Sequence, residues 1–463
     1  MSTPPLPEDF LAQLSSLLGD EEAIRLKEVL LQAPKISIRC NPAKPFARSL
    51  GKRPIPWTKT GFYLDERPSF TLDPAFHAGA YYVQEASSMI IEYALHQLGI
   101  PKGIYLDLAA APGGKSTLLS SYLGEEGFLV ANEVIQARAQ ILKENIIKWG
   151  LGNVLVSQND PEHFTPLEGF FDLVLVDAPC SGEGMFRKDP QAREEWSEEH
   201  VALCCLRQKR ILDKAASLVK GGGYLIYSTC TFNRKENEGV ISALLEEFAF
   251  TPVRIPLDPS WGIEESRFDT EEGQAYGYRF YPHRVEGEGF FFSILQRPES
   301  FGTKAAKSKK EQRVSQVKPV GEKEGQALEE ELGLDGKGSY FLFQENLFRI
   351  QKSFSKEVAS LLRTLNVRYF GVELGKKQGK EWIPSHEWAI STLPKFHFPS
   401  LELSKEESLD FLRKKDFPLE QAPSGWVLLT YRNLPLGWVK KLDKRVNNYY
   451  PKEWRIRMEN PNG

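Results

Sequence analysis

Two cysteines that follow predicted strands are the residues of this chain best suited to covalent chemistry. Cys180 ends the segment VLVDAPC and Cys230 ends YLIYSTC, and a glycine-rich turn, LDLAAAPGGKS at 106–116, precedes both. Parallel strands end on one side of a sheet, where α/β proteins bind ligands, so the three segments are predicted to meet at one pocket. A thiolate there can add to C6 of a pyrimidine, which makes C5 nucleophilic enough to accept a methyl group.

The other cysteines are interpreted as small apolar residues. Cys204 and Cys205 lie in a helix pattern and Cys40 in an extended segment. The chain has no Cys-x-x-Cys, which counts against thiol–disulfide exchange and a structural zinc site, so no metal is expected. A zinc deaminase would need a second cysteine where Glu183 stands after Cys180, and an upstream His-x-Glu that is absent.

The residues after Cys230 predict a helix start that would favour its thiolate. Asn233 is a candidate N-cap, with Glu236 at the third helical position. A helix N-terminus, together with Arg234 and Lys235, would stabilise negative charge on the sulfur.

The glycine-rich turn predicts a nucleotide-binding site. Its small residues let the backbone approach a ligand, and the helix N-terminus behind them favours a carboxylate or a phosphate. Acids follow the next three strands: Glu133 suits a ribose diol, Asp160 could accept a hydrogen bond from an adenine amine, and Asp177 ends the fourth strand. Because of these acids, a plain turn between strand and helix is the less favoured interpretation.

The turn departs from the phosphate-binding P-loop pattern. Gly114, Lys115 and Ser116 match the end of G-x-x-x-x-G-K-[ST], but Ala109 stands where the first glycine belongs. Pro112 also lies inside the loop. These departures count against a nucleoside triphosphatase.

Strands and helices alternate from residue 103 onwards, which predicts parallel βαβ units with right-handed crossovers in a doubly wound sheet. A hairpin with the turn Gly287-Glu288-Gly289 follows and is predicted to form an antiparallel edge. The five strands are expected within 104–109, 128–134, 153–160, 170–179 and 222–230.

Size and charge fit a multidomain protein with local basic surfaces. The chain has 463 residues, with 41% apolar and 26% charged side chains, and no apolar run reaches the roughly 18 residues of a membrane span. The start shows no signal-peptide pattern, and the cysteine spacing no disulfide framework, so a cytoplasmic location is expected. The net charge is −3, yet 303–323 carries seven basic against two acidic residues and 431–457 eight against two, which suits local phosphate binding.

These motifs resemble those of the Nop/Sun family of RNA cytosine-5 methyltransferases, which use S-adenosylmethionine. The matching pieces are DLAAAPGGK, Glu133 with Arg138, Asp160, DAPCSGEG and STCTF; the family usually has Cys where Ala109 stands. The resemblance implies Cys230 as the nucleophile, Cys180 as an aid to product release, and Asp177 as a further contact to the target base. It implies cofactor contacts at Ala109, Ala110, Ala111, Pro112, Gly113, Gly114, Lys115, Glu133, Arg138, Asp160 and Asp177.

The C-terminal half resembles the bacterial RsmF/YebU type of this family, through YFLFQENLFRI, GVELGKKQGKEWIPSHEWAIS, LPLGWVKK and NNYYPKEWRIR. That type modifies 16S ribosomal RNA at the decoding region, so the resemblance implies 16S RNA or the 30S subunit as partner. The tail resembles a PUA-like RNA-binding module. The aromatic residues Trp438, Tyr449, Tyr450 and Trp454 among its basic residues favour stacking on RNA.

The expected fold is therefore α/β: a Rossmann-like methyltransferase sheet, a small α+β N-terminal domain and small C-terminal domains ending in a PUA-like fold. The expected units are an RNA-contacting domain at 1–98, the catalytic domain at 99–298, a basic flexible linker at 299–337, a small domain at 338–393 and the PUA-like domain at 394–463. A monomer is expected. Two alternatives stay open: the same chemistry on transfer RNA, and an RNA-binding ribosome assembly factor.

Overall fold

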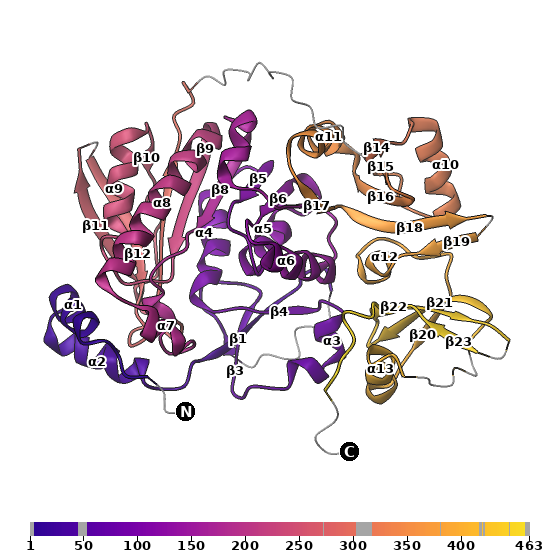
Figure 1. Cartoon of the computed structure of the whole chain (residues 1–463), viewed down its shortest axis with the longest axis horizontal. Coiled ribbons are helices and arrows are strands. Elements are labelled where there is room, and N and C mark those ends of the chain that lie inside the picture. Colours follow the sequence, from indigo (N-terminus) through magenta and orange to yellow (C-terminus); the bar gives the residue numbers. More distant parts are fainter. Residues whose placement is uncertain are drawn as a thin grey trace.

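Four sheets with helices packed around them make up the protein (Figure 1). The computed structural model describes residues 4–44, 53–271, 273–301, 317–379, 381–415, 419, 422–443 and 445–458. No helix in these ranges is long and apolar enough to cross a membrane.

The N-terminal segment is a helical hairpin followed by a small antiparallel sheet. The hairpin is α1 (Glu8–Leu18) and α2 (Asp20–Leu30), and the sheet has the order β2 (Arg53–Pro54), β3 (Gly61–Leu64), β1 (Ile36–Cys40) and β4 (Tyr81–Val83). The short helix α3 (Pro74–His77) precedes β4, and α4 (Ile90–Leu98) follows it. Phe10 of α1 is buried against Phe186, with ring centroids 4.9 Å apart, so the hairpin packs on the catalytic domain.

A mixed sheet forms the centre of the molecule, in the order β11-β12-β13-β9-β8-β5-β6-β7-β17. Its parallel strands are β5 (Ile104–Asp107), β6 (Phe128–Asn132), β7 (Val154–Ser157), β8 (Phe171–Asp177) and β9 (Val219–Thr229). Each predicted strand of this set is present, and the runs are apolar because they are covered on both faces. The helices are α5 (Gly114–Leu123), α6 (Gln136–Trp149), α7 (Gln191–Glu195), α8 (Glu198–Leu218) and α9 (Glu238–Glu247).

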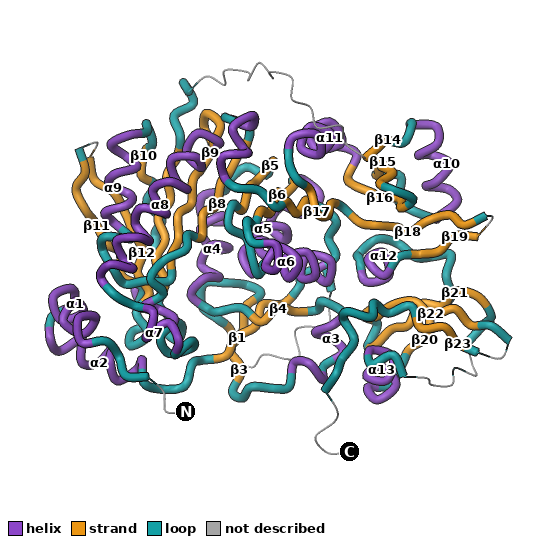
Figure 2. Tube along the Cα trace, in the orientation of Figure 1, coloured by secondary structure: helices purple, strands orange, loops and turns teal. Residues whose placement is uncertain are grey.

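Helices gather in two groups around this sheet (Figure 2). Helix α5 packs against both α4 and α6, whereas α8 packs against α9. The doubly wound arrangement expected from the alternating pattern is therefore present.

An antiparallel strand pair follows the last parallel strand, as predicted, but its connection is longer than expected. Strand β12 (Gly273–Phe280) pairs antiparallel with β13 (Phe290–Gln296), which pairs with β9. Their connection spans 281–289 rather than a tight Gly-Glu-Gly turn, and two further strands, β10 (Thr251–Pro252) and β11 (Glu264–Thr270), extend this edge.

The second half begins with a five-stranded antiparallel sheet. Its strands are β14 (Val317–Pro319), β15 (Gly338–Phe343), β16 (Asn346–Gln351), β18 (Val372–Gln378) and β19 (Glu381–Pro384), with helices α10 (Glu322–Leu332), α11 (Ser355–Thr364) and α12 (His386–Ile390). Strand β14 and helix α10 lie inside the expected linker, whose residues 302–316 are outside the described ranges. Strand β17 (Val367–Phe370) pairs with β7, so this unit extends the catalytic sheet.

The C-terminal unit is a four-stranded sheet with one helix. Its elements are β20 (Ser400–Glu402), α13 (Lys405–Leu412), β21 (Gly425–Tyr431), β22 (Leu434–Lys441) and β23 (Val446–Asn448). The prediction that its aromatic residues stack on RNA is wrong for Trp438 and Tyr450, which are 0% and 2% exposed. They fill cores instead, because large aromatic side chains contribute most to a small hydrophobic core. Tyr449 remains exposed and Trp454 partly so.

Candidate active site

A cavity of about 260 Å³ lies beyond the carboxyl ends of β5, β8 and β9. It is lined by Tyr82, Val83, Gln84, Glu85, Ser88, Asp107, Ala109, Ala110, Ala111, Pro112, Gly114, Lys115, Asp177, Met185, Lys188, Cys230, Gly289 and Phe290. The structure therefore brings together most of the glycine-rich turn, the last strand acid and one of the two strand-end thiols, as the sequence predicted.

The two thiols are in direct contact. The Sγ atoms of Cys180 and Cys230 are 3.3 Å apart, although the residues follow different strands. Cys230 lines the cavity, whereas Cys180 lies behind it. The hydrogen bond to Cys230 and burial raise the pKa of the Cys180 thiol well above its usual value. Cys180 therefore holds its proton, and Cys230 is the sulfur that a substrate in the cavity would meet.

Two buried carboxylates tie together the loops that carry the thiols. Glu183, after Cys180, accepts the backbone N–H of Phe232 at 3.0 Å. Glu236, after Cys230, accepts the backbone N–H of Ser181 at 3.0 Å and its hydroxyl at 2.5 Å. The carboxylate of each loop thus accepts hydrogen bonds from the other loop. These bonds hold the two loops together and so set the distance between the two sulfurs.

Further side chains donate hydrogen bonds to these two carboxylates. Gln208 of α8 donates to Glu236 at 2.8 Å, and Trp196 donates to Glu183 at 3.0 Å. Gln13 of α1 donates to Glu183 at 2.9 Å and accepts from Asn233 at 2.7 Å. The N-terminal hairpin therefore supports the catalytic loops, a contact that no local sequence pattern indicated.

The predicted helix start after Cys230 is wrong. Helix α9 begins at Glu238, with Asn237 before it, while the Asn233 side chain accepts the Lys235 N–H within a turn. Glu236 cannot complete a capping box because its carboxylate is engaged with the neighbouring loop. Lys115, which lines the same cavity, is a cation that interacts electrostatically with Cys230.

Lys115 and Asp177 form an ion pair inside the cavity. The Lys115 Nζ lies 2.8 Å from Asp177 Oδ2 and 5.1 Å from the centre of the Phe290 ring. Burial opposes the charge, but Asp177 outweighs it and holds the pKa of Lys115 above its usual value. Ser228 donates to the other Asp177 oxygen at 2.8 Å. Lys115 is thus a fixed cation, and Asp177 is an acceptor held in place on both oxygens.

The glycine-rich turn is held open by backbone contacts. The Ala110 N–H donates to the Asn132 carbonyl at 2.8 Å, and Arg138 donates to the Ala111 carbonyl at 2.8 Å. Gly113 precedes α5 with φ +115°, a conformation that favours glycine. Ala109 lines the cavity with its neighbours, so the departure from the usual Cys leaves the turn in place.

Asp107, which the sequence reasoning did not single out, is the most unusual acid of the cavity. It is 1% exposed, and its Oδ2 accepts the Ser116 hydroxyl at 2.6 Å. Its Oδ1 has no hydrogen-bond partner among the described residues. Burial raises the pKa of Asp107 to about 7. Its position at the carboxyl end of the first strand, before the small residues, is the signal that could have identified it.

The other predicted cofactor residues lie outside the cavity lining. Glu133 is buried, accepts the Ile135 N–H at 2.9 Å, and lies 3.5 Å from Arg138. Asp160 pairs with Arg210 at 2.5 Å, and this contact, with a backbone N–H, lowers its pKa although burial opposes it. Gly113, Glu133, Arg138 and Asp160 therefore follow the strands as predicted but do not line the space around Cys230.

Arg39 joins the N-terminal sheet to the glycine-rich turn. It is 1% exposed, lies 4.4 Å from the centre of the Trp149 ring, and donates to Gln84 at 2.7 Å. Its guanidinium also donates to the Gly114 carbonyl at 3.2 Å and to the Thr117 hydroxyl at 2.5 Å. Arg39 of β1 thus links the N-terminal sheet to the first turn of helix α5.

The fold and the cavity define a Rossmann-like methyltransferase with an added N-terminal domain and C-terminal domains. Three family descriptions match: "16S rRNA methyltransferase RsmB/F" over residues 100–296, "N-terminal domain of 16S rRNA methyltransferase RsmF" over 6–86, and "Methyltransferase RsmF PUA domain" over 398–456. The chain belongs to the RsmF family of 16S ribosomal RNA methyltransferases.

Full-length relatives and solved structures agree with this family. "Ribosomal RNA small subunit methyltransferase F" of Erwinia tasmaniensis is 31% identical and that of Salmonella typhi 33%, each with 96% of both chains covered. A solved methyltransferase homolog from Pyrococcus horikoshii is 31% identical, covers 63% of this chain and 95% of its own, and has a TM-score of 0.53. NSun6 from the same organism, at 21% identity and a TM-score of 0.53, covers 64% of this chain and 99% of its own and shows the fold alone.

Proposed function

We propose that this chain uses S-adenosylmethionine to methylate C5 of a cytosine in 16S ribosomal RNA, with Cys230 as the covalent nucleophile. The observation that carries the proposal is that the thiol of Cys230 lines the same cavity as the Lys115–Asp177 pair, with a second thiol 3.3 Å from it. A cytosine C5 needs covalent activation before it can attack a methyl group, and a half-buried sulfur that lines the same cavity as a fixed cation suits that step.

The residues of the cavity fit the proposed cofactor. The unpartnered Oδ1 of Asp107 is a buried acceptor suited to a cationic ligand group, and the turn at 109–114 offers close backbone approach. Glu133 follows the neighbouring strand, where a ribose would be held, and Ile135 beside it is 53% exposed and apolar, as a stacked base requires. Bound S-adenosylmethionine would supply the electrophilic methyl group.

The other steps of the proposed reaction are assigned to side chains of this protein. Cys230 adds to C6 of the base, and Lys115 stabilises the negative charge of the reacting thiolate. Asp177 is positioned as an acceptor for the exocyclic amine of cytosine. Product release needs both the C6–S bond and the C5–H bond to break: Cys180 gives its proton to the departing Cys230 Sγ, and the Cys180 thiolate so formed takes the proton that C5 loses.

Two variants test this assignment. Cys230→Ala should form no 5-methylcytosine, whereas Cys180→Ala should accumulate a covalent protein–RNA complex on a denaturing gel. Cys205→Ala, on helix α8 outside the cavity, is the matched control and should turn over normally. If Cys180→Ala turns over freely without an adduct, the division of labour between the thiols is wrong.

The substrate is tested by mapping 5-methylcytosine in total RNA from cells with and without the gene. Loss of one or more sites in 16S RNA supports the proposal, and loss in transfer RNA alone would reassign the substrate. If a Cys230→Ala protein rescued the phenotype of the deletion, the assembly-factor alternative would be favoured. An active monomer in the cytoplasm is part of the proposal.

A further inference from the structure

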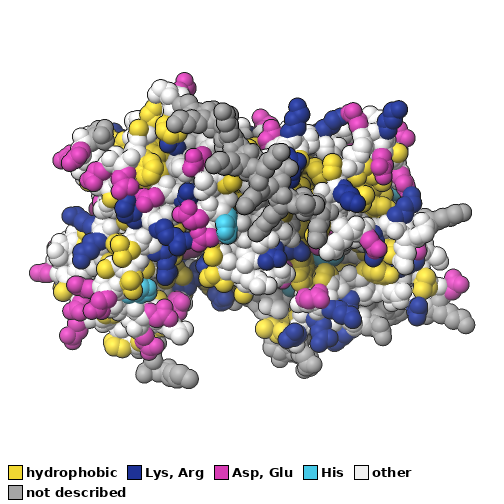
Figure 3. Space-filling model, turned by 45° about the horizontal axis from the view of Figure 1, so that its top comes forward, with side chains coloured by type: hydrophobic (Ala, Val, Ile, Leu, Met, Phe, Trp, Pro, Cys, Tyr) yellow, Lys and Arg dark blue, Asp and Glu magenta, His cyan; other side chains and the backbone are white. Residues whose placement is uncertain are grey.

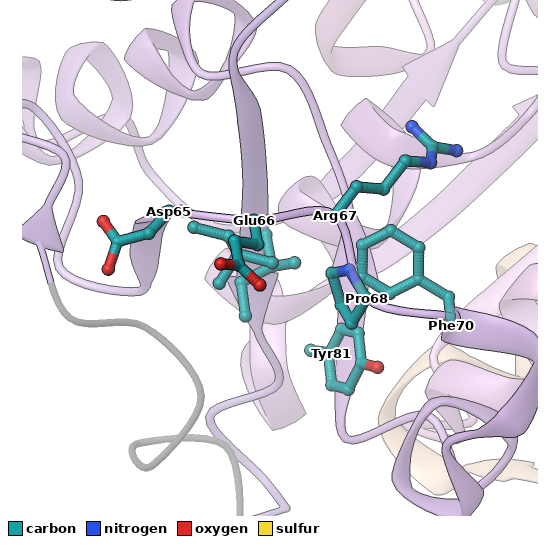
Figure 4. A pocket seen from close by; sticks show the side chains of 8 residues that line it. Asp65, Glu66, Arg67, Pro68, Phe70 and Tyr81 are labelled. Carbon is teal, nitrogen blue, oxygen red and sulfur yellow. The ribbon is translucent and has the colours of Figure 1, made fainter.

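A second cavity, of about 420 Å³, opens on the N-terminal sheet (Figure 4). Ile38 and Tyr81, which are 0% and 3% exposed, form its floor. Leu64 and Phe70 form its walls, and the exposed loop that carries Glu66 forms its rim.

The cavity has the chemistry of a site for a flat, amine-bearing ring. The Phe70 and Tyr81 rings are 6.2 Å apart, and the Arg67 guanidinium lies 5.7 Å from the centre of the Phe70 ring. Tyr81 donates its hydroxyl to Asp73 at 2.7 Å, so it offers the cavity its ring rather than a donor. Figure 4 shows Pro68, Phe70 and Tyr81 close together and Glu66 to one side of them. Aromatic faces accept a stacked base, and a carboxylate accepts its amino group.

The two cavities border the same strand, β4, which is the edge strand of the N-terminal sheet. Val83 lines the catalytic cavity, and its cross-strand partner Ile38 lines the second cavity. Tyr81 lies two residues before Val83 on the same face, a distance of about 7 Å along a strand. Both cavities therefore border β4.

Charge also favours the sheet over the helical hairpin as the RNA surface. Acidic side chains gather over the hairpin (Figure 3), where Glu8, Asp9, Asp20 and Glu21 are exposed. Phosphates are repelled there. The rim of the second cavity carries Arg67 together with Asp65 and Glu66, so its charge is mixed. Arg67 places a cation beside the Phe70 ring, a combination that binds single-stranded nucleic acid.

We propose that this second cavity binds the base of a nucleotide adjacent to the target cytidine, and that Glu66 selects bases carrying an exocyclic amine. The inference rests on the proposed function, since it takes the catalytic cavity as the site of the target base. Guanine, adenine and cytosine present an amino group to a carboxylate and uracil does not, so uridine at this position is disfavoured.

Methylation of short RNAs that differ only in the nucleotide before or after the target cytidine tests the proposal. With the full-length chain, uridine at one of these two positions should raise KM about tenfold, the worth of one charge-assisted hydrogen bond. Glu66→Gln should reduce the preference to about threefold, because its neutral amide oxygen accepts more weakly than a carboxylate, while kcat for the best RNA stays near that of the unaltered chain. Glu246→Gln, at an exposed acid on α9, is the matched control and should keep it.

A photo-crosslink gives an independent readout. RNA with 6-thioguanosine at the sensitive position, which keeps an exocyclic amine, should crosslink to a peptide containing Phe70 or Tyr81. Equal use of all four bases, or crosslinks only elsewhere with methylation intact, would overturn the second site and leave the proposed function standing. If the unaltered chain methylates none of these RNAs, the proposed function fails. The second site is then tested by RNA binding alone, which must show the same base preference to support it.

Discussion

The pKa of Asp107 leads to a quantitative expectation for cofactor binding. Burial raises it to about 7, so near neutral pH the carboxyl is only half ionised. A cationic ligand group binds the carboxylate and not the neutral acid, so affinity for S-adenosylmethionine should rise with pH. Between about pH 5.5 and pH 7 the ionised fraction grows from about 3% to about one half, and the apparent Kd should fall about 15-fold.

Over this pH range the charge of Asp107 changes while the charge of the ligand does not. The α-amino group of the cofactor titrates at about pH 8 and stays protonated throughout. The same pKa shift should weaken the unliganded fold as pH rises from about 4 to 7, because ionisation of a buried acid is unfavourable in the folded state. Ligand binding is the cleaner measurement, since a chain with several domains need not unfold in one step.

Isothermal titration calorimetry of S-adenosylmethionine at about pH 5.5, 6 and 7 is the assay. Asp107→Asn keeps the shape of the side chain and should bind weakly with no dependence on pH. Ser116→Ala removes a hydrogen bond that lowers the pKa of Asp107, so the rise in affinity should move to higher pH. An unaltered protein with constant affinity, or an Asp107→Asn variant with the same slope, would refute the argument.

Three further variants follow from the contacts around the cavity. Glu236→Gln replaces one of the two oxygens that accept from Ser181 and Gln208 with an NH2 donor. Product formation should therefore fall at least tenfold while calorimetric cofactor affinity is kept, because up to about 3 kcal/mol of loop contacts is lost. Arg39→Lys replaces a fork of donors with one point charge and should lower both the melting temperature and cofactor affinity by calorimetry. Burial lowers the pKa of Lys395 to about 7 in the folded protein. Between about pH 7 and pH 9 the side chain is therefore protonated in the unfolded chain and mostly neutral in the folded one, so raising the pH favours folding. Over this range the free energy of unfolding of the unaltered protein, measured by denaturant titration, should rise by up to about 2 kcal/mol relative to that of Lys395→Met.

The sequence predicted the catalytic sheet well because its signals are local. Apolar runs followed by Cys180, Cys230 or the glycine-rich turn specify strand ends, and parallel strands end on one side. Asp107 was missed because its significance depends on burial, which the sequence does not show for a single acid. The pairing of β17 with β7 joins segments about 200 residues apart and has no local pattern.

The aromatic residues of the tail show where composition misleads. Trp438 lies on a strand with basic residues, and that mixture suggested a surface for RNA. Its ring is instead packed against Phe398 and Trp388, with centroids 4.7 and 6.1 Å away. In a small unit few residues can fill the core, so an aromatic residue on a strand is used there first.

The asymmetry of the two thiols comes from tertiary structure. Cys180 and Cys230 each follow a buried parallel strand, so their local sequences give them similar surroundings. Only the fold places Cys230 in the cavity lining together with Lys115 and leaves Cys180 out of that lining, where contact with Cys230 and burial keep it protonated. Hydrogen bonds from each loop to the buried carboxylate of the other loop fix this arrangement. Moving one loop would leave a buried acid without its donors. One sulfur is thereby suited to attack and the other to give up a proton, although both are the same amino acid.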